Sequence, residues 1–421
     1  MDPATFPLRN WAGNVTFGAG DLLRPGSLSE LQRLAAKERR LRPIGTRHSF
    51  SPVADTNGKL VSVAGLPPRV ELDSDRGTAR VSAGLRYSDI TPALDAAGRA
   101  LPNLASLPHI SVAGAVATGT HGSGDGNGSL ATAVSGLELI TADGDLVEVS
   151  RDADPGRFAG LVVSLGACGI VTALTLDTVP AFEIRQYVYQ DLPFSQAAGH
   201  FDEITAAGYS VSMFTDWAAG SFTGVWVKLA REQEVPPPGW LGSRLASADV
   251  HMIAGLPAAN CTPQLGVPGP WHERLPHFRA RFTPSAGAEL QSEFLVPRAD
   301  AVPALEALTA IAAQLAPVIL ISELRTVAAD ELWLSPAYQR DSAAFHFTWV
   351  PDTSAVLPVL ARVEAALAPF APRAHWGKIF TAEPAEVAGG YGRLADFRDL
   401  VRELDPAGKF SNGLLDSLIR G

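Results

Sequence analysis

Apolar and polar residues recur along residues 1–180 in patterns that predict short helices and strands. A capping box, Ser27-Leu28-Ser29-Glu30, precedes an apolar stripe and predicts a helix over about residues 28–38. A second helix is predicted over about residues 88–97, because Gly98 stands at the position of a left-handed cap. Asp75-Arg76-Gly77 and Asp143-Gly144 predict two hairpin turns. The apolar runs predict strands near residues 41–44, 61–64, 70–72, 79–82, 134–140, 146–149 and 166–177, and a helix near 158–164.

After Pro180 the pattern changes, and strands, helices and Pro-rich loops alternate. Helices laid against an antiparallel sheet predict a second domain of α+β type. Single cores stop growing at about 250–300 residues, so 421 residues favour two domains. We expect a first domain over residues 1–180, a cap domain over 181–374 and a return to the first domain over 375–421. The cap helices are predicted near 195–207, 299–315 and 354–368, and its strands near 183–189, 210–216, 225–229, 289–296, 318–327 and 344–350.

Charge and cysteine content narrow the class of protein. The formal net charge is −10 and the pI about 5.4, and the chain has no basic stripe, so nucleic-acid binding is not expected. Two cysteines, Cys168 and Cys261, allow neither a disulfide framework nor a Cys-based metal cluster, and no metal is expected. The first residues lack a secretory pattern, and the longest apolar stretch, near residues 161–176, is too short to span a bilayer. We expect a cytoplasmic monomer without a membrane partner.

The stretch LPNLASLPHISVAGAVATGTHGSG, residues 101–124, is rich in glycine and in short hydroxyl side chains. Glycine lets the backbone approach a ligand closely, and successive bare N–H groups form a concave donor surface for anions. A Gly/Ser surface loop is the alternative, but a solvated linker would not carry the interleaved Leu, Ile and Val residues. We interpret the stretch as the floor of a dinucleotide site that contacts pyrophosphate and a flavin ring.

His48 lies in a Gly-containing turn directly after a predicted strand, within Pro43 to Phe50. A histidine at this place can bind phosphate, cap a helix, or attack an electrophile as a neutral imidazole. Beside an oxidised flavin it can form a permanent carbon–nitrogen bond at the C8 methyl group. The residues alone favour a satisfied loop histidine, because a lone histidine is weak evidence for any of these roles.

Two predicted strands carry polar residues spaced by two, which place both side chains on one face. Glu323 and Arg325 stand in an apolar strand, where charged groups are rarely buried unless paired or functional, and together they can grip polyol hydroxyls. An exposed ion pair is the alternative. His346 and Thr348 alternate with aromatic residues, and a core histidine with satisfied nitrogens is the alternative there.

Lys378 follows a glycine in His375-Trp376-Gly377-Lys378, between Trp376 and Phe380. Partial burial lowers the pKa of a lysine and suits it to proton transfer. The alternative is a surface lysine that lays its stem over apolar neighbours.

Three stretches, RPIGTRHSF, ASLPHISVAGAVATGTHGSG and SLGACGIVTALTL, resemble the FAD-binding domain of the vanillyl-alcohol-oxidase-type flavoproteins. Together with SELRTVAAD, HFTWV and HWGKIF they are similar to the alditol oxidase branch of that family, over nearly the whole chain and in the family's order. The resemblance implies an α+β, two-domain FAD-binding fold of the PCMH type, with an α+β cap domain that carries a large antiparallel sheet.

The resemblance also implies the site residues. His48 matches the family's flavin-linking histidine, and a single link is expected because no cysteine stands near residues 104–106 for a second one. Arg47 departs from the family, where glycine is usual, and it can pair with pyrophosphate or crowd the turn. Positions that match FAD contacts are Pro43, Ile44, Gly45, Thr46, Arg47, Ser49, Ser106, Ser111, Gly114, Thr118, Gly119, Thr120, His121, Ile170 and His375. Positions that match substrate binding are Ser106, Glu323, Arg325, Thr348 and Lys378, with Lys378 and His346 as the catalytic pair.

The reaction implied by the resemblance is oxidation of the terminal hydroxyl of a linear polyol, such as xylitol or sorbitol, to the aldose, with oxygen reduced to hydrogen peroxide. Lys378, helped by His346, would take or polarise the hydroxyl proton. The nearest alternative is an aldonolactone oxidase or dehydrogenase on the same flavin domain. A nicotinamide-dependent reductase and a non-catalytic flavin or sugar-binding module are the remaining alternatives, and the module should lack Glu323, Arg325, His346 and Lys378.

Overall fold

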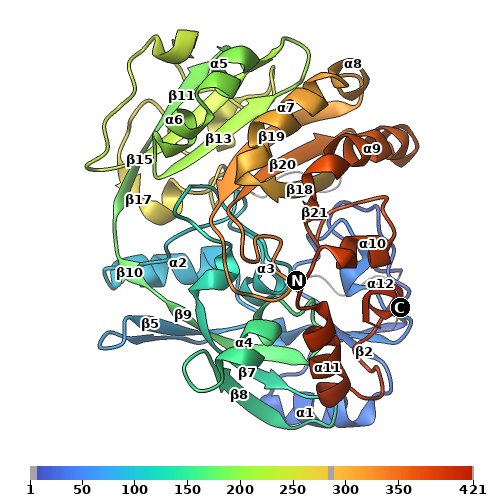
Figure 1. Ribbon diagram of the computed structural model, residues 1–421. Helices are drawn as coiled ribbons and strands as arrows, with labels where there is room; N and C mark the ends of the chain where they lie inside the picture. The colour runs from blue at the N-terminus through green and yellow to red at the C-terminus, as the bar shows by residue number, and fades with distance from the viewer. Residues whose placement is uncertain (1–6, 283–288, 420–421) are drawn as a thin grey trace.

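The computed structural model describes residues 7–282 and 289–419, which form a lower and an upper half (Figure 1). Residues up to 180 build most of the lower half around an antiparallel sheet, order β4-β5-β9-β7-β8, and a parallel sheet, order β1-β3-β2. The strands are β1 (Asp21–Leu23), β2 (Leu41–Pro43), β3 (Lys59–Val61), β4 (Val70–Asp73), β5 (Thr78–Ser82), β6 (Arg99–Ala100), β7 (Val134–Ile140), β8 (Leu146–Ser150), β9 (Ile170–Asp177) and β10 (Val179–Pro180). The helices are α1 (Leu28–Lys37), α2 (Tyr87–Ala96), α3 (Val112–Ala117) and α4 (Pro155–Val162).

Two strands of this half differ from their predicted extent for local reasons. The strand predicted over 61–64 already ends at Val61, because the Ser62 hydroxyl accepts a hydrogen bond from the Ala64 N–H (3.4 Å) and starts a 3-10 turn. The strand predicted from residue 166 begins only at β9, because Gly166 and Gly169 both adopt positive φ. Turn chemistry therefore overrides the apolar pattern at both places.

Helix ends are also decided by local hydrogen bonds. The helix predicted over 158–164 begins earlier, at Pro155, because the Asp154 carboxylate accepts a hydrogen bond from the Arg157 N–H (3.1 Å) and caps it. The stretch 101–124 is not a loop throughout, since it contains α3. The helix predicted over 195–207 is interrupted at His200, whose φ is −132°.

The upper half is built on a nine-stranded sheet with the order β16-β11-β15-β13-β19-β20-β18-β21, in which β17 pairs with β11. Helices α5 to α9 cover the upper face of this sheet in Figure 1, and the other face is turned toward the lower half. The strands are β11 (Glu183–Gln190), β12 (Leu192–Pro193), β13 (Ser210–Thr215), β14 (Ser221–Phe222), β15 (Gly224–Ala230), β16 (Arg244–Leu245), β17 (Gly269–Pro270), β18 (Leu290–Pro297), β19 (Ile319–Val327), β20 (Ser342–Trp349) and β21 (Arg373–Ala374). The helices are α5 (Phe194–Gly199), α6 (Phe201–Ala206), α7 (Ala301–Thr309), α8 (Ala312–Leu315) and α9 (Thr353–Leu367).

Helix α9, predicted near residues 354–368, and the turn after it form an apolar segment that the sequence analysis did not consider as a membrane span. By length and composition alone, Thr353–Phe370, with a mean hydropathy of 1.3, is sufficient to cross a membrane. In the structure its residues at helical spacing, Val356, Leu360, Val363 and Leu367, lie in the apolar core beneath the helices of the upper half. The segment therefore covers one face of the sheet with a single apolar stripe.

After β21 the chain returns to the lower half. Helices α10 (Pro384–Gly389), α11 (Leu394–Leu404) and α12 (Gly413–Ile419) lie beside the blue and teal segments in Figure 1. Phe397, Leu400 and Leu415 are buried in the same core as residues of α4, β7 and β9. Residues far apart in sequence thus share one apolar core.

Arg42, at the centre of β2, connects this C-terminal segment to β2 through a hydrogen bond to Phe410. It is 1% exposed, and its guanidinium donates hydrogen bonds to the carbonyls of Val53 (3.2 Å), Gly166 (3.0 Å) and Phe410 (2.6 Å). Burial lowers the pKa of Arg42 to about 9. Because a buried cation needs its donors satisfied, all three carbonyl segments are held at fixed positions around β2.

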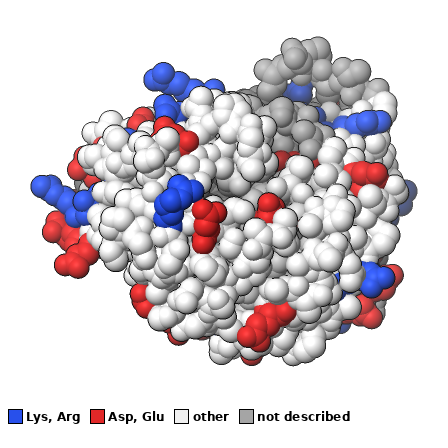
Figure 2. Space-filling view, turned by 90° about the horizontal axis from the view of Figure 1, so that it is seen from above, with Lys and Arg blue, Asp and Glu red and all other residues white. Residues whose placement is uncertain are grey.

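Charges of both signs are interspersed on the face seen from above (Figure 2). On the described part of this face the blue and red atoms lie in small groups, mostly toward the rim, and no continuous basic stripe is visible.

Candidate active site

A cavity of about 490 Å³ lies between the two halves. Its lower side, here called the loop wall, consists of residues 43–51 and of lining residues between 105 and 121. Its upper side, here called the sheet wall, consists of polar side chains on three neighbouring strands, namely Gln291 and Glu293 on β18, Glu323 and Arg325 on β19, and His346 and Thr348 on β20.

Most of the residues singled out from the sequence meet at this cavity. Gly119 and Ile170 do not line it. The Ile170 side chain is fully buried in a separate core with Leu31 and Leu41, and a side chain at Gly119 would face Pro336. The residues that line the cavity are Pro43, Ile44, Gly45, Thr46, Arg47, His48, Ser49, Ser106, Ser111, Gly114, Thr118, Thr120, His121, Glu323, Arg325, His346, Thr348, His375 and Lys378.

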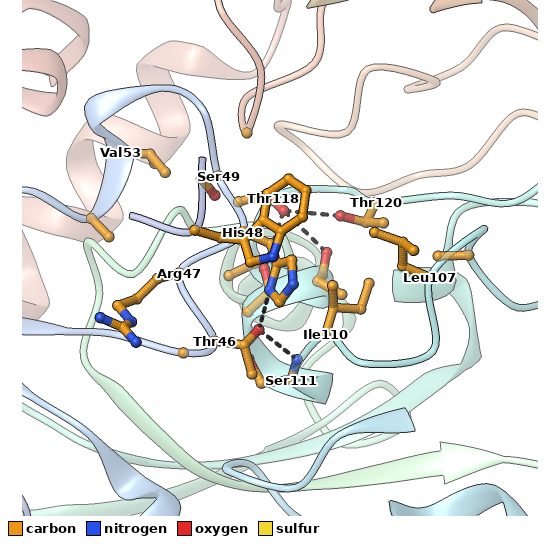
Figure 3. A pocket seen from close by; sticks show the side chains of 18 of the residues that line it. Thr46, Arg47, His48, Ser49, Val53, Leu107, Ile110, Ser111, Thr118 and Thr120 are labelled. Atoms are coloured by element: carbon orange, nitrogen blue, oxygen red, sulfur yellow. Dashed lines mark hydrogen bonds between the residues drawn. The ribbon is translucent and has the colours of Figure 1, made fainter. Parts of the chain in front are cut away.

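His48 is held in the loop wall by one hydrogen bond and one stacked ring. Its Nδ1 lies 3.0 Å from the hydroxyl oxygen of Thr46, which also accepts a hydrogen bond from the Ser111 N–H at 3.2 Å (Figure 3). The Trp11 ring stacks on the imidazole with centroids 5.5 Å apart. Burial, followed by nearby positive groups, lowers the pKa of His48 to about 4. The imidazole is therefore neutral near pH 7, which is the state that a nitrogen nucleophile requires.

Arg47 occupies a backbone conformation that favours glycine. Its φ is +65°, and its guanidinium donates a hydrogen bond to the Arg9 carbonyl (3.2 Å). A side chain in this left-handed region stores about 1 kcal/mol of strain. The turn around His48 thus carries a small conformational cost that a glycine would not.

The loop wall has the properties of a dinucleotide cradle. A Cβ at Gly45 would overlap the Ser111 hydroxyl, and one at Gly114 would lie 2.7 Å from the same oxygen. The Thr118 hydroxyl donates a hydrogen bond to the Gly114 carbonyl (3.1 Å) and lies 3.2 Å from the Thr120 hydroxyl (Figure 3). Bare backbone, short hydroxyls and an apolar lining fit a pyrophosphate and a flavin ring, so these residues are suited to hold FAD.

Strand register brings the sheet wall together. His346 on β20 pairs with Glu323 on one side and with Glu293 on the other, and Thr348 pairs with Gln291. The intervening residues Leu324, Phe345 and Phe347 point into the core beneath the helices. The alternation of side chains along each strand therefore separates an apolar face from a polar face that lines the cavity.

The charges of the sheet wall are buried and paired. Arg325 donates to Glu293 (2.5 Å), and its Nε lies 3.6 Å from Glu323 Oε2. Burial alone would raise the pKa of Glu293 and of Glu323. The Arg325 charge outweighs burial and holds both pKa values below the usual range, with the further help of His121 at Glu293 and of His277 at Glu323. Both carboxylates are therefore ionised acceptors at neutral pH.

The hydrogen bonds of Gln291 determine which nitrogen of His346 carries the proton. Lys378 Nζ is a donor, so the Gln291 atom beside it is the carbonyl oxygen, and the amide nitrogen donates to Glu289 (2.5 Å). The same oxygen lies 3.2 Å from His346 Nε2, which must then carry a proton. His346 Nδ1 is left as an acceptor, and it is buried without a hydrogen-bond partner among the described residues.

His346 and Lys378, which both lie beside the Gln291 oxygen, have lowered pKa values. Burial and then the Lys378 charge lower the pKa of His346 to about 3, so its ring is neutral. Burial also lowers the pKa of Lys378. The turn before Lys378 is fixed by the Gly377 N–H, which donates to His375 Nδ1 (3.0 Å), and by the Lys378 N–H, which donates to the His375 carbonyl (3.0 Å). A neutral imidazole and the Nζ donor of Lys378 thus meet the same Gln291 oxygen at the cavity.

Several candidate site residues were missed by the sequence analysis. Gln291 and Glu293 follow the same spacing by two that singled out Glu323 and Arg325, so the signal was present in a strand that was predicted correctly. His277 lies 2.8 Å from Glu323 but stands outside the helices and strands, where no periodicity marks it. Loop residues of this kind are found only from the tertiary structure.

Comparisons with known proteins agree with this geometry. A family model described as an FAD binding domain matches residues 22–150, and one described as D-arabinono-1,4-lactone oxidase matches residues 288–418. An alditol oxidase of Streptomyces sp. is 52% identical over 98% of this chain and 99% of its own length. An L-gulono-1,4-lactone dehydrogenase of Mycobacterium tuberculosis is 26% identical over 96% of both chains.

Among solved structures, cholesterol oxidase from B. sterolicum is similar, with a TM-score of 0.79 at 16% identity over 98% of this chain and 96% of that one. At that identity the likeness shows the fold alone. The expected fold class, a PCMH-type FAD-binding fold with a large antiparallel sheet in the second half, is confirmed.

Proposed function

Because the chain belongs to the alditol oxidase family of FAD-dependent oxidoreductases, we propose that it oxidises the terminal hydroxyl of a linear polyol such as xylitol or sorbitol. The products are the aldose and, from molecular oxygen, hydrogen peroxide. The observation that carries the proposal is the sheet wall, in which buried donors and acceptors face the same cavity as the loops suited to FAD.

Lys378 and His346 are placed to handle the hydroxyl proton. FAD, when bound, accepts a hydride from carbon and passes electrons to oxygen. Lys378, whose pKa burial lowers, takes or polarises the proton of the reacting hydroxyl, and His346 Nδ1, the buried acceptor, helps by accepting a hydrogen bond. Negative character on the hydroxyl oxygen weakens the neighbouring carbon–hydrogen bond, so both contacts favour oxidation.

The remaining polar groups bind the other hydroxyls. Glu323 Oε2 accepts and Arg325 Nε donates, 3.6 Å apart, and a hydroxyl both donates and accepts a hydrogen bond. Ser106, which lies 3.4 Å from Arg325 Nη1, and Thr348 supply further hydroxyls at the cavity. Alcohols that lack these hydroxyls leave buried groups unpaired, and the site discriminates against them.

We further propose that His48 carries FAD covalently. The link would join one imidazole nitrogen to the C8 methyl carbon of FAD. One C–H bond of the methyl group and the imidazole N–H bond would each lose a proton, the two electrons would pass to the isoalloxazine, and molecular oxygen would remove electrons and protons as hydrogen peroxide. The neutral state of His48 and its place in the loop wall support this role. Acid precipitation of the purified protein should give a yellow pellet, and His48→Ala should release the colour into the supernatant. A colourless wild-type pellet contradicts the link.

Oxidation of a sugar lactone is the second candidate, favoured by the family model that matches residues 288–418. A peroxide assay with xylitol, sorbitol, gulonolactone and galactonolactone separates the two. We expect polyols to give peroxide and lactones to give little. Activity on the lactones alone would replace the proposed function.

We also propose that the enzyme works as a cytoplasmic monomer. Light scattering of the purified protein and fractionation of cells that express it test the two parts separately. A dimer, or recovery outside the cytosol, contradicts the corresponding part.

A further inference from the structure

Lys228 is a buried cation on β15 that the proposed reaction does not use. It is 1% exposed, and its ammonium donates to the carbonyls of Leu275 and Pro276 (the second at 3.1 Å) and lies 3.3 Å from His277 Nδ1. Burial lowers its pKa to about 7. Three donors are thus engaged by three acceptors, and none of these acceptors is a carboxylate. Buried lysines without an acidic partner are rare, so this one requires an explanation.

The contacts of His277 decide its tautomer. Lys228 donates, so Nδ1 of His277 accepts and its proton resides on Nε2. Nε2 lies 2.8 Å from Glu323 Oε1 and therefore donates to that carboxylate. Phe214 and Trp226 pack edge-to-face on the imidazole, with centroids 5.5 and 5.3 Å away, and fix the plane of the ring.

The orientation of Glu323 follows from this chain of hydrogen bonds. His277 occupies Oε1, so Oε2 remains for a ligand and lies 3.6 Å from Arg325 Nε, which has no hydrogen-bond partner among the described residues. If Glu323 turned toward Arg325 with both oxygens, the two groups would satisfy each other. The acceptor and the donor would then be lost to a hydroxyl.

We propose that Lys228 and His277 are positioning residues that hold Glu323 turned toward the cavity, and so set the affinity for the polyol hydroxyl that Glu323 receives. The proposal rests on the proposed function, because it deepens the role of Glu323 in polyol binding. Lys228 does not line the cavity, and His277 lines it on the side of Glu323 rather than beside Lys378 and His346.

The first experiment determines the tautomer directly and does not depend on turnover. Nitrogen-15 NMR of the holoenzyme labelled at histidine distinguishes protonated from unprotonated ring nitrogens, and loss of one signal set in His277→Gln assigns His277. We expect protonated Nε2 and unprotonated Nδ1 in the wild type, and a gain of the Nδ1–H form in Lys228→Met. A wild-type ring with its proton on Nδ1 overturns the proposal.

The second experiment separates binding from chemistry. Anaerobic rapid mixing with xylitol yields the dissociation constant and the limiting rate of flavin reduction. Lys228→Met and His277→Leu should raise the dissociation constant about 10- to 100-fold, as expected for a lost hydrogen bond to a charged group. The limiting rate should change far less. His277→Gln retains both an amide donor for Glu323 and an acceptor for Lys228, so it should bind xylitol nearly as the wild type does.

Lys409→Met is the matched control. Lys409 is also a buried lysine, and it donates to the carbonyls of Ala35 and Ala142, but it does not line the cavity. Its substitution should lower stability and leave xylitol binding unchanged. Equal loss of xylitol binding in Lys409→Met, or none in Lys228→Met and His277→Leu, overturns the proposal. If no polyol reduces the wild-type flavin, the proposed function fails, and the NMR measurement still decides the tautomer of His277.

Discussion

The two walls of the cavity are built by different means. The loop wall uses backbone, glycine and short hydroxyls, and a Cβ at Gly45 would already overlap Ser111. The sheet wall uses long polar side chains on three strands whose opposite face is packed apolar core. Backbone N–H groups and glycines allow a phosphate or a flat ring to approach closely, whatever the rest of the ligand is. A set of fixed polar side chains instead selects ligands by the arrangement of their hydroxyls. Substitutions in the sheet wall should therefore impair substrate oxidation, and substitutions in the loop wall should impair FAD binding.

The largest effect is expected at the proton-handling end of the sheet wall. Lys378→Met removes a donor that meets Gln291 at the cavity, and the rate of anaerobic flavin reduction by xylitol should fall about 10²- to 10⁴-fold. FAD content should stay at the wild-type level. Lys59→Met, which removes a lysine paired with Glu38 on the surface of the lower half, is the control and should reduce flavin normally. A near-normal rate in Lys378→Met would remove this residue from proton handling.

A substitution in the loop wall should lower the FAD content of the protein. Gly45→Ala forces Ser111 to move, so the purified protein should retain much less FAD, as measured by the ratio of flavin to protein absorbance. Ser111→Ala in the same chain removes the overlapping oxygen and should restore part of the FAD. Full FAD in the single variant would show that the two loops do not need this close approach.

A smaller effect is expected on the free energy of unfolding in acid. It tests whether the buried histidines around the cavity are neutral in the folded protein. Burial is the main cause that lowers the pKa of His48 and His277 to about 4 and of His346 and His375 to about 3. The unfolded chain therefore binds more protons below about pH 6.5, and the free energy of unfolding should fall as pH is lowered through that window.

His346→Gln should reduce that slope by at most about 1.4 kcal/mol per pH unit. Urea unfolding between pH 4.5 and 7 measures this slope, because histidines titrate in that range in the unfolded chain while these four stay neutral in the folded protein. His200→Gln, at an exposed position beside Glu203, is the matched control. Identical slopes in wild type and His346→Gln would mean that the imidazole is not held neutral.

The smallest effect is expected at Arg47. Arg47→Gly relieves the left-handed backbone at φ +65° but loses the hydrogen bond to Arg9, so stability should rise by about 1 kcal/mol or less. Gln339→Gly, at φ +53° and away from the cavity lining, is the control for strain alone. If only Arg47→Gly also increases the fraction of acid-stable flavin, the strain is specific to the turn of His48. A loss of stability would show that the contact with Arg9 outweighs the strain.

How well the sequence predicts each wall depends on whether its residues follow a local sequence pattern or are brought together only by tertiary contacts. Alternation by two located Glu323, Arg325, His346 and Thr348, because a strand turns every second side chain to one face. The glycine and hydroxyl pattern located the loop wall, but it did not reveal α3 inside it. His277 stands in a segment without periodicity, and the role of Lys228 depends on a partner 49 residues away. Such pairings arise from tertiary contacts, which no local pattern encodes.

The carbonyl partners of Arg42, which include Leu165 beside Gly166, have a consequence for how the protein is made. Its contact with Phe410 spans 368 residues, so a nascent chain that has left the ribosome up to residue 400 has the cation without this partner. An incompletely coordinated guanidinium opposes closure of the apolar interior around β2. We therefore expect a chain truncated before Phe410 to be less stable around β2 than the full chain.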